Sequence, residues 1–206
     1  MIYKYAKQKD ITELNKWCLD IIHSVQYDLR DYFTFDIHLV GSGEKRLVTM
    51  DSNGLFDLDY NLIIQRDRQD LINDPKTIKN LFINAFKKEL NEVVEGFNHV
   101  CDSTSVVKNK IIYGDRLQFK FDVAILVKAD NDSYYKLVND HRTGNYIWNQ
   151  VRDSKNCVER FLAVKHAGLF NQFKERYLEL KNFHSNRGDD VQSFSIFLET
   201  LNDFET

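Results

Sequence analysis

The sequence predicts an α+β fold, in which a small mixed sheet carries helices over one face and leads into a helical C-terminal portion. Two periodicities support this fold class. Apolar residues recur at three- and four-residue steps over 11–29 and 78–93, as they do in amphipathic helices. Apolar and polar residues alternate over 117–127, as in a strand with one buried face. Strand signals stop at about Asp130, so we expect a core of residues 1–130 and a helical portion of residues 131–206.

Local signals place the first elements of the core. Asp10 to Glu13 has the form of a capping box, which predicts the start of the first helix there. A strand is expected over 35–40, ending at the turn Gly41-Ser42-Gly43. Asp74-Pro75 predicts the start of the second helix, because aspartate caps the first turn and proline needs no N–H there. Gly96 is expected to end that helix.

The later elements are predicted in the same way. A strand is expected over 103–113, and Gly114-Asp115 should turn the chain into the strand 117–127. Beyond that strand, helices are expected to begin near Asn156 and Val191, with a loop over 182–190. We expect this helical portion to pack against the sheet and to form the second wall of a cleft, where binding sites are common.

Composition narrows the class of protein. The 206 residues carry a net charge of only −3, so a site for nucleic acid would have to be local, because no global basic field exists to attract the phosphate backbone. Three widely spaced cysteines without a C-x-x-C pair argue against a disulfide framework and a structural zinc site. We find no apolar run long enough to span a membrane and no signal-peptide pattern, and therefore expect a cytoplasmic protein without a membrane partner.

Three aspartates are the candidate chemical centre. Asp57 and Asp59 lie two residues apart in a predicted strand, so their side chains share a face. Asp122 is the one acid on the polar face of the strand 117–127. Carboxylates held close together repel one another, and magnesium or manganese with oxygen ligands is the usual way to neutralise them. Taken singly, each acid also has an ordinary interpretation as a solvated strand end or a salt-bridge partner.

The order of these motifs resembles the DNA polymerase β-like nucleotidyltransferase superfamily, in particular its small bacterial-type members. The resemblance rests on the Gly-Ser turn at 41–43, the D-x-D of Asp57 and Asp59, and the later Asp122, and it covers roughly residues 1–130. It implies a palm-like sheet and a catalytic triad of these three aspartates that binds two Mg²⁺ or Mn²⁺ ions. It also implies that backbone amides of the turn meet a nucleoside triphosphate.

The resemblance further implies which residues bind the nucleotide. Gly41, Ser42 and Gly43 would form the phosphate-binding turn, as helix N-termini do for anions in general. Lys45 and Arg46 follow the turn and are candidates for contacts to the phosphates, although an exposed basic edge is at least as good an interpretation. Tyr146 and Trp148 could stack on a nucleobase, but packing in the core is the favoured interpretation.

The resulting hypothesis is a metal-dependent nucleotidyltransferase that moves a nucleoside monophosphate from a triphosphate to a hydroxyl acceptor, with release of pyrophosphate. The acceptor is open: a small molecule such as an antibiotic, a nucleotide, an RNA end or a protein. A toxin with an antitoxin as protein partner is one form of the last. The alternative is a non-catalytic nucleotide sensor or partner-binding protein with the same fold.

Overall fold

The computed structural model describes residues 2–93, 97–113, 116–140, 142–151 and 155–204. The chain divides into two compact units. The sheet unit comprises Lys7–Arg46 and Asp57–Val151, and the helical unit comprises Met1–Ala6, Leu47–Phe56 and Arg152–Thr206. The boundary expected at residue 130 does not coincide with this division, because the chain contributes two separate N-terminal segments to the helical unit.

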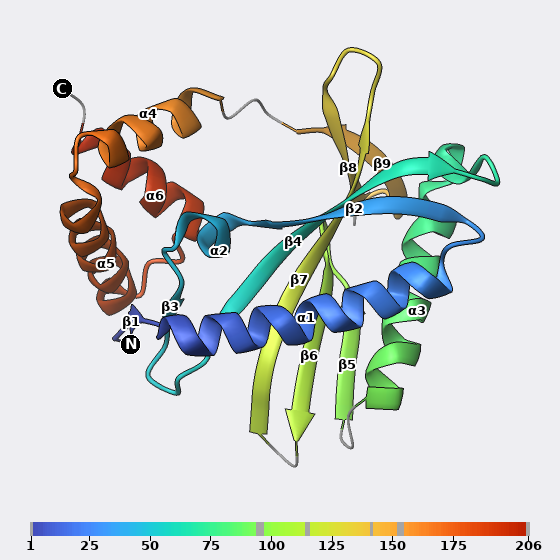
Figure 1. Cartoon of the computed structure of the whole chain (residues 1–206), viewed down its shortest axis with the longest axis horizontal. Coiled ribbons are helices and arrows are strands. Elements are labelled where there is room, and N and C mark those ends of the chain that lie inside the picture. Colours follow the sequence, from blue (N-terminus) through green and yellow to red (C-terminus); the bar gives the residue numbers. More distant parts are fainter. Residues whose placement is uncertain (1, 94–96, 114–115, 141, 152–154, 205–206) are drawn as a thin grey trace. The chain divides into compact units, whose positions relative to one another are not determined.

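The sheet unit contains a seven-stranded mixed sheet (Figure 1), as the sequence predicted. Its main path runs β2-β4-β7-β6-β5, and β8 pairs with both β7 and β9. Strand β4 runs parallel to β7, whereas the other pairs are antiparallel. The strands are β2 (Phe33–Val40), β4 (Asp57–Asp67), β5 (Phe97–Asp102), β6 (Val107–Tyr113), β7 (Arg116–Lys128), β8 (Tyr134–Asp140) and β9 (Asn145–Gln150).

Two strand predictions were wrong. The sheet does not stop at Asp130, because β8 and β9 form a further hairpin. Both contain residues that favour strands, such as Tyr135, Val138 and Ile147, and this signal was overlooked. In the sheet β8 pairs with β7, with Lys136 opposite Leu126. The strand expected over 103–113 was wrong only in its start: β6 begins at Val107, because residues 103–106 form the turn from β5, closed by a hydrogen bond from Ser103 N to Val106 O of 3.1 Å.

Two long helices cover one face of this sheet, α1 (Gln8–Asp28) and α3 (Pro75–Val93). The predicted capping box was wrong: α1 begins at Gln8, its N-cap Lys7 makes no side-chain cap hydrogen bond, and Asp10 lies in the first turn. The cap of α3 was correct, because Thr77 N donates to Asp74 Oδ1 at 3.1 Å. A short 3₁₀ helix, η1 (Leu71–Asn73), precedes it. Gly96 and Gly114-Asp115 lie outside the described residues.

Burial alternates strictly along β4 and decides which face carries the acids. Leu58, Tyr60 and Leu62 are buried against the helices, whereas Asp57 and Asp59 between them are partly exposed. The Tyr60 hydroxyl donates to Asn15 Oδ1 of α1 at 2.8 Å, which fixes the helix on that face. The expected arrangement, with helices on one face and carboxylates on the other, is therefore confirmed.

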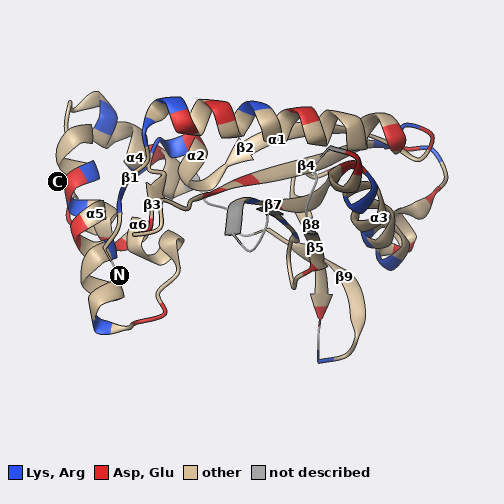
Figure 2. Cartoon of the chain, turned by 90° about the horizontal axis from the view of Figure 1, so that it is seen from below, with Lys and Arg blue, Asp and Glu red and all other residues tan. Residues whose placement is uncertain are grey.

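The outer surface of α1 carries charges of both signs (Figure 2), as expected of a solvated helix face in a chain with little net charge.

A buried ion pair lies under α3. Lys79 is 1 % exposed, and its Nζ lies 3.2 Å from Asp102 Oδ1 and 3.1 Å from Val106 O. Burial lowers the pKa of Lys79, although the Asp102 carboxylate opposes this. This contact joins α3 to the β5–β6 hairpin.

The two aromatic residues of β9 have structural partners in the sheet unit. The Tyr146 hydroxyl donates to Asp102 Oδ2 at 2.6 Å, and this hydrogen bond raises the pKa of Tyr146 to about 12. Trp148 Nε1 donates to Ile72 O at 2.8 Å. Both contacts favour a structural role for these residues over stacking on a nucleobase.

The helical unit has its own aromatic core. It contains α4 (Lys155–His166), α5 (Phe170–Arg187) and α6 (Ser193–Asn202), with a short strand pair of β1 (Lys4–Tyr5) and β3 (Thr49–Met50). Phe161, Phe173 and Phe197 meet edge to face with ring centroids 5.2 to 5.8 Å apart. Such aromatic pairs contribute about 1 kcal/mol each beyond their buried area.

The loop predicted over 182–190 is too long. Helix α5 continues to Arg187 and ends at Gly188, whose φ of 74° is the left-handed C-cap that glycine favours. The last turn is held to α6 by His184, whose Nε2 lies 2.8 Å from Glu199 Oε2, and this hydrogen bond raises the pKa of His184. Across the described ranges, no helix combines the length and apolar character that a membrane crossing requires.

Candidate functional site

Parallel pairing of β4 with β7 brings the three predicted aspartates to one face of the sheet. Asp59 lies directly opposite Asp122 in the register, and Asp57 lies opposite Lys120. Residues paired in this way project to the same side, so the three carboxylates and the Lys120 ammonium share the face that the helices leave open. Two strands that are far apart in the chain therefore supply one cluster of acids.

Burial and mutual repulsion make two of these carboxylates hard to ionise. The pKa of Asp59 is raised to about 6, first by burial and then by the charges of Asp57 and Asp122. The pKa of Asp122 is also raised, first by burial and then by Asp57. Lysines on the same sheet oppose both shifts, but they do not cancel them. The pair is thus poised to gain from a cation placed between the strands.

Asp57 has a different environment. Its side chain is 47 % exposed, and Lys120 Nζ lies 3.2 Å from its Oδ2 atom. The sequence analysis missed this lysine, although the spacing signals it: Lys120 precedes Asp122 by two residues and so lies on the same face. Lys108 and Lys110 of β6 also belong to this face, since they pair with Asp122 and Lys120.

The Gly-Ser turn lies against the acid cluster. Val40, the last residue of β2, pairs with Asp59, and the short helix α2 (Gly41–Lys45) follows at once. Gly41 has a φ of 64°, and a Cβ atom there would lie 2.9 Å from Asp59 Oδ2. Glycine is needed at 41 both for its backbone conformation and for the space that the carboxylate occupies.

The second glycine of the turn leaves room for a neighbouring side chain. A Cβ atom on Gly43 would lie 2.9 Å from Leu39 Cδ1, so Leu39 would have to move to admit a side chain there. The two glycines together let the backbone of the turn sit directly above the edge of the sheet beside Asp59.

The N-terminal turn of α2 offers backbone donors. Its N-cap Val40 is extended and gives no side-chain cap hydrogen bond, and the first amides of a helix have no partner within the helix. The amides of Ser42 and Gly43 can therefore donate to an anion. Lys45 lies 3.3 Å from Glu44 Oε2, and Arg46 is exposed at the C-cap with a φ of 60°. Both cations are thus at the other end of α2.

The donor set fits a hard divalent cation. Mg²⁺ and Mn²⁺ prefer carboxylate oxygens, and Asp57, Asp59 and Asp122 supply only such ligands from one face. Across residues 2–93, 97–113, 116–140, 142–151 and 155–204, however, no three acidic, histidine or cysteine side chains already converge as a metal-binding group. The backbone arrangement is in place, and the side chains would have to turn toward a shared ion.

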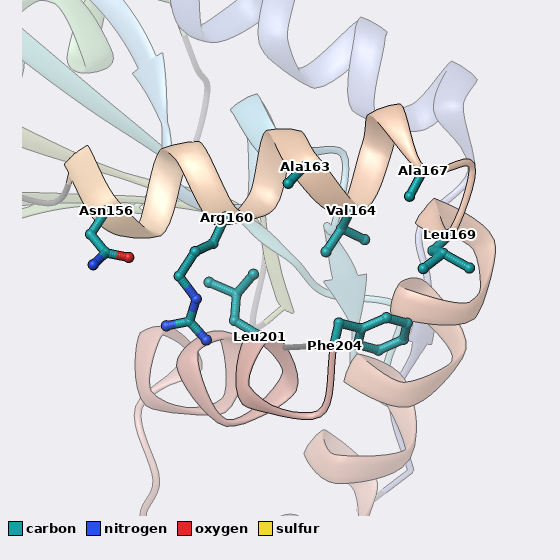
Figure 3. Close-up of a pocket in the computed structure, with 8 residues that line it drawn as sticks. All are labelled: Asn156, Arg160, Ala163, Val164, Ala167, Leu169, Leu201 and Phe204. Atoms are coloured by element: carbon teal, nitrogen blue, oxygen red, sulfur yellow. The ribbon is translucent and has the colours of Figure 1, made fainter. Parts of the chain in front are cut away.

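A separate hollow belongs to the helical unit. It has a volume of about 500 Å³ and lies between α4, α6 and the α4–α5 turn (Figure 3). Figure 3 shows mostly apolar side chains around it, with Arg160 and Asn156 at one end. Arg160 Nη2 donates to Asn202 Oδ1 at 2.9 Å. None of the predicted site residues lines this hollow.

No protein-family model matches the sequence, and no curated protein matches it. Solved structures do match. The 3'-deoxy ATP bound form of DncV from Vibrio cholerae has a TM-score of 0.59 at 15 % identity, over 91 % of this chain and 51 % of that chain. The chain has the nucleotidyltransferase fold of DncV. The DncV cyclic AMP-GMP synthase with nonhydrolyzable GTP aligns at a TM-score of 0.61 and 15 % identity, with the same coverage. The fold predicted from the Gly-Ser turn and the three aspartates is therefore confirmed.

A third DncV structure, with the linear intermediate 5' pppA(3',5')pG, aligns at a TM-score of 0.59 and 14 % identity, over 84 % of this chain and 46 % of that chain. This chain thus spans about half the length of the DncV chains that it matches. One DncV structure is of a variant in which two aspartates, two positions apart, are replaced by alanine.

Asp59→Asn should stabilise the metal-free protein at pH 7 to 8. The folded-state pKa of Asp59, about 6, lies above the unfolded value near 4, so the free energy of unfolding falls as the pH rises from about 4 to about 6 and stays low above that. Removing the charge should raise the free energy of unfolding by at most about 3 kcal/mol at pH 8 and by little at pH 4. Urea unfolding in a chelator at both pH values measures this.

The matched control is Asp36→Asn, on the exposed part of β2, which should change stability by less than about 0.5 kcal/mol at either pH. A loss of stability in Asp59→Asn of equal size at pH 4 and pH 8 would show that Asp59 has a purely structural role.

Proposed function

We propose that the chain is a metal-dependent nucleotidyltransferase, which moves a nucleoside monophosphate from a triphosphate to a hydroxyl acceptor and releases pyrophosphate. The observation that carries the proposal is that the glycine turn and the acid cluster are direct neighbours. The backbone of Gly41 packs against the carboxylate of Asp59, and Asp59 pairs in register with Asp122. The first amides of a helix and two carboxylates with raised pKa values thus adjoin, which is what a reaction at a phosphate beside a metal ion requires.

The order of the strands supports a model in which the two substrates approach from opposite sides of the acids. Helix α2 follows β2, so a triphosphate on the Ser42 and Gly43 amides would enter from the β2 side of Asp59. Asp122 lies on β7, one strand farther from α2. An acceptor in line with the bond that breaks must come from the side away from the leaving pyrophosphate, and that is the Asp122 side.

Each aspartate then has a role that its position supports. Asp57, Asp59 and Asp122 would hold two Mg²⁺ or Mn²⁺ ions, which supply charge neutralisation and make an acceptor hydroxyl more acidic when bound. Asp122 would orient the acceptor hydroxyl and take its proton, because it is the acid nearest the acceptor side. The acceptor oxygen would then form a bond to the α-phosphorus as the bond to pyrophosphate breaks, and the amides of α2 would hold the phosphates that leave.

The neighbours by fold favour a nucleotide as acceptor among the classes left open. The DncV structures are described with 3'-deoxy ATP, with nonhydrolyzable GTP and with a linear intermediate in which one nucleotide has been joined to another. The three cysteines are free, which fits the cytoplasm as the proposed compartment of the reaction. Lys45 and Arg46 remain candidates for phosphate contacts at the far end of α2.

Gly41→Ala should weaken binding of a nucleoside triphosphate at least tenfold. The new methyl group would meet Asp59 Oδ2, and the positive φ would be strained as well. The matched control is Gly144→Ala, whose φ of 71° is similar but whose added Cβ would meet nothing within 4 Å. Gly144→Ala should lose about 1 kcal/mol of stability from its positive φ, and Gly41→Ala should lose more because of its contact with Asp59, whereas only Gly41→Ala should lose affinity. Calorimetry with a non-hydrolysable ATP or GTP analogue measures the difference, and equal affinities would contradict a phosphate site at this turn.

Asp122→Asn should retain triphosphate binding and lose transfer by a factor of about 10³ or more. Binding depends mainly on the turn and on β4, whereas transfer needs the carboxylate on the acceptor side. The measurement is pyrophosphate release with Mg²⁺ or Mn²⁺ over a panel of nucleoside triphosphates and acceptors. Tight nucleotide binding by the wild-type chain without any pyrophosphate release would favour a non-catalytic sensor instead.

A further inference from the structure

The proposed metal site already contains a cation that belongs to the chain. Lys120 of β7 lies opposite Asp57 of β4, and its Nζ atom is 3.2 Å from Asp57 Oδ2. The side chains of Lys120 and Asp57 are 38 % and 47 % exposed. The pair is therefore not fixed by surrounding packing, and both side chains have room to move.

The neighbours of Lys120 explain why its ammonium points to Asp57. On its other side, across the β6–β7 pair, Lys120 lies opposite Lys110, and like charges facing one another across strands are destabilising. In the described part of the chain, Asp57 is the ion-pair partner of Lys120. The lysine is thus repelled from β6 and attracted to β4, toward the acids.

The same contact accounts for the absence of a converged metal-binding group among the described residues. Asp59 and Asp122 lie side by side in the register, whereas Asp57 engages the ammonium. A divalent ion shared by all three aspartates and an ammonium 3.2 Å from Asp57 Oδ2 would place two cations beside one carboxylate. Because like charges at this range repel, the ammonium opposes binding of the ion, and a bound ion in turn favours the release of the ammonium from Asp57.

We propose that Lys120 is an internal counter-cation of the metal site: it pairs with Asp57 in the metal-free chain, and a divalent ion must displace it to be held by Asp57, Asp59 and Asp122. This inference rests on the proposed function for the identity of the metal ligands. Lys120 is a positioning residue that sets the affinity for the ion, because the energy of its pair with Asp57 is lost when the ion binds.

Displacement of Lys120 also couples the binding of the metal ion to the binding of the nucleotide. Once released, the ammonium remains on the open face, two residues before Asp122. A triphosphate brings negative charge to that face and offers the lysine a new partner. The ion should therefore bind weakly alone and more tightly in the presence of a nucleotide, and this coupling should depend on Lys120.

The test is Mn²⁺ binding to the full chain, measured by calorimetry without nucleotide. Lys120→Met keeps the apolar stem and removes the charge, and it should tighten Mn²⁺ binding about fivefold or more. Lys136→Met is the matched control. Lys136 acts electrostatically on Asp59 from β8, whereas Lys120 is the ammonium paired with Asp57. Lys136→Met should tighten Mn²⁺ binding less than about twofold.

A second measurement separates displacement from misfolding. Metal-free Lys120→Met should unfold at a lower temperature than the wild-type chain, because the acids lose a counter-charge. Mn²⁺ should then raise the unfolding temperature of Lys120→Met by more than it raises that of the wild type. Lys120→Gln gives the same comparison should the methionine variant fold poorly. A nucleotide analogue should increase Mn²⁺ affinity more in the wild type than in either variant.

Three results would overturn the inference. The first is a Mn²⁺ affinity that is unchanged or weaker in Lys120→Met. The second is an equal gain of affinity in Lys136→Met, which would indicate a general electrostatic effect of removing a lysine. Either result would leave the proposed function intact provided that Asp59→Asn abolishes Mn²⁺ binding. Mn²⁺ binding that does not depend on Asp59 would instead contradict the metal site itself, and with it both proposals.

Discussion

The parallel pairing of β4 with β7 is the constraint on which the candidate site depends. It puts Asp59 opposite Asp122 and Asp57 opposite Lys120, although the two strands are separated by α3 and the β5–β6 hairpin. Parallel neighbours need a long crossover connection, and here that connection supplies the helix that buries the opposite face of the sheet. A shift of one residue in this register would turn the acids into the core and the apolar residues to the open face.

The apolar face and the acid face thus both follow from the alternation of side chains along β4 and β7. Tyr60 and Phe121 meet edge to face with ring centroids 6.3 Å apart. Tyr60 is next to Asp59 in the sequence and Phe121 is next to Asp122, and the aspartates face the other side of the sheet. The energy of burying these rings keeps two mutually repelling carboxylates side by side. The raised pKa values of Asp59 and Asp122 reflect this opposition, and they explain why a cation at the open face is the natural complement of the fold.

The sequence was sufficient to predict the sheet, the helix-covered face and the three aspartates on the open face. Each of these follows from periodicity or from a short motif, such as Asp74-Pro75 at the start of α3. Strands β8 and β9 were missed although Tyr135, Val138 and Ile147 favour strands, whereas the pairing of β8 with β7 is a long-range contact that the sequence does not reveal. The extent of α5 past residue 182 depends in the same way on the contact of His184 with Glu199 in another helix.

The ion pair of Lys120 with Asp57 shows a further limit of sequence reasoning. Spacing within β7 places Lys120 on the same face as Asp122, but only the register with β4 brings its ammonium to Asp57. Likewise, the motif Gly-Ser-Gly predicted a phosphate-binding turn, whereas the contact of Gly41 with the Asp59 carboxylate required the structure. Register between strands is a long-range property, and it decides which motifs become neighbours.

The most direct test of this account is a crystal structure of the full chain with a non-hydrolysable nucleoside triphosphate and Mn²⁺. Anomalous scattering would locate the manganese independently of the protein atoms. The account predicts two manganese peaks on Asp57, Asp59 and Asp122, with the triphosphate on the amides of Ser42 and Gly43. A triphosphate bound away from this turn, or manganese held elsewhere, would contradict it.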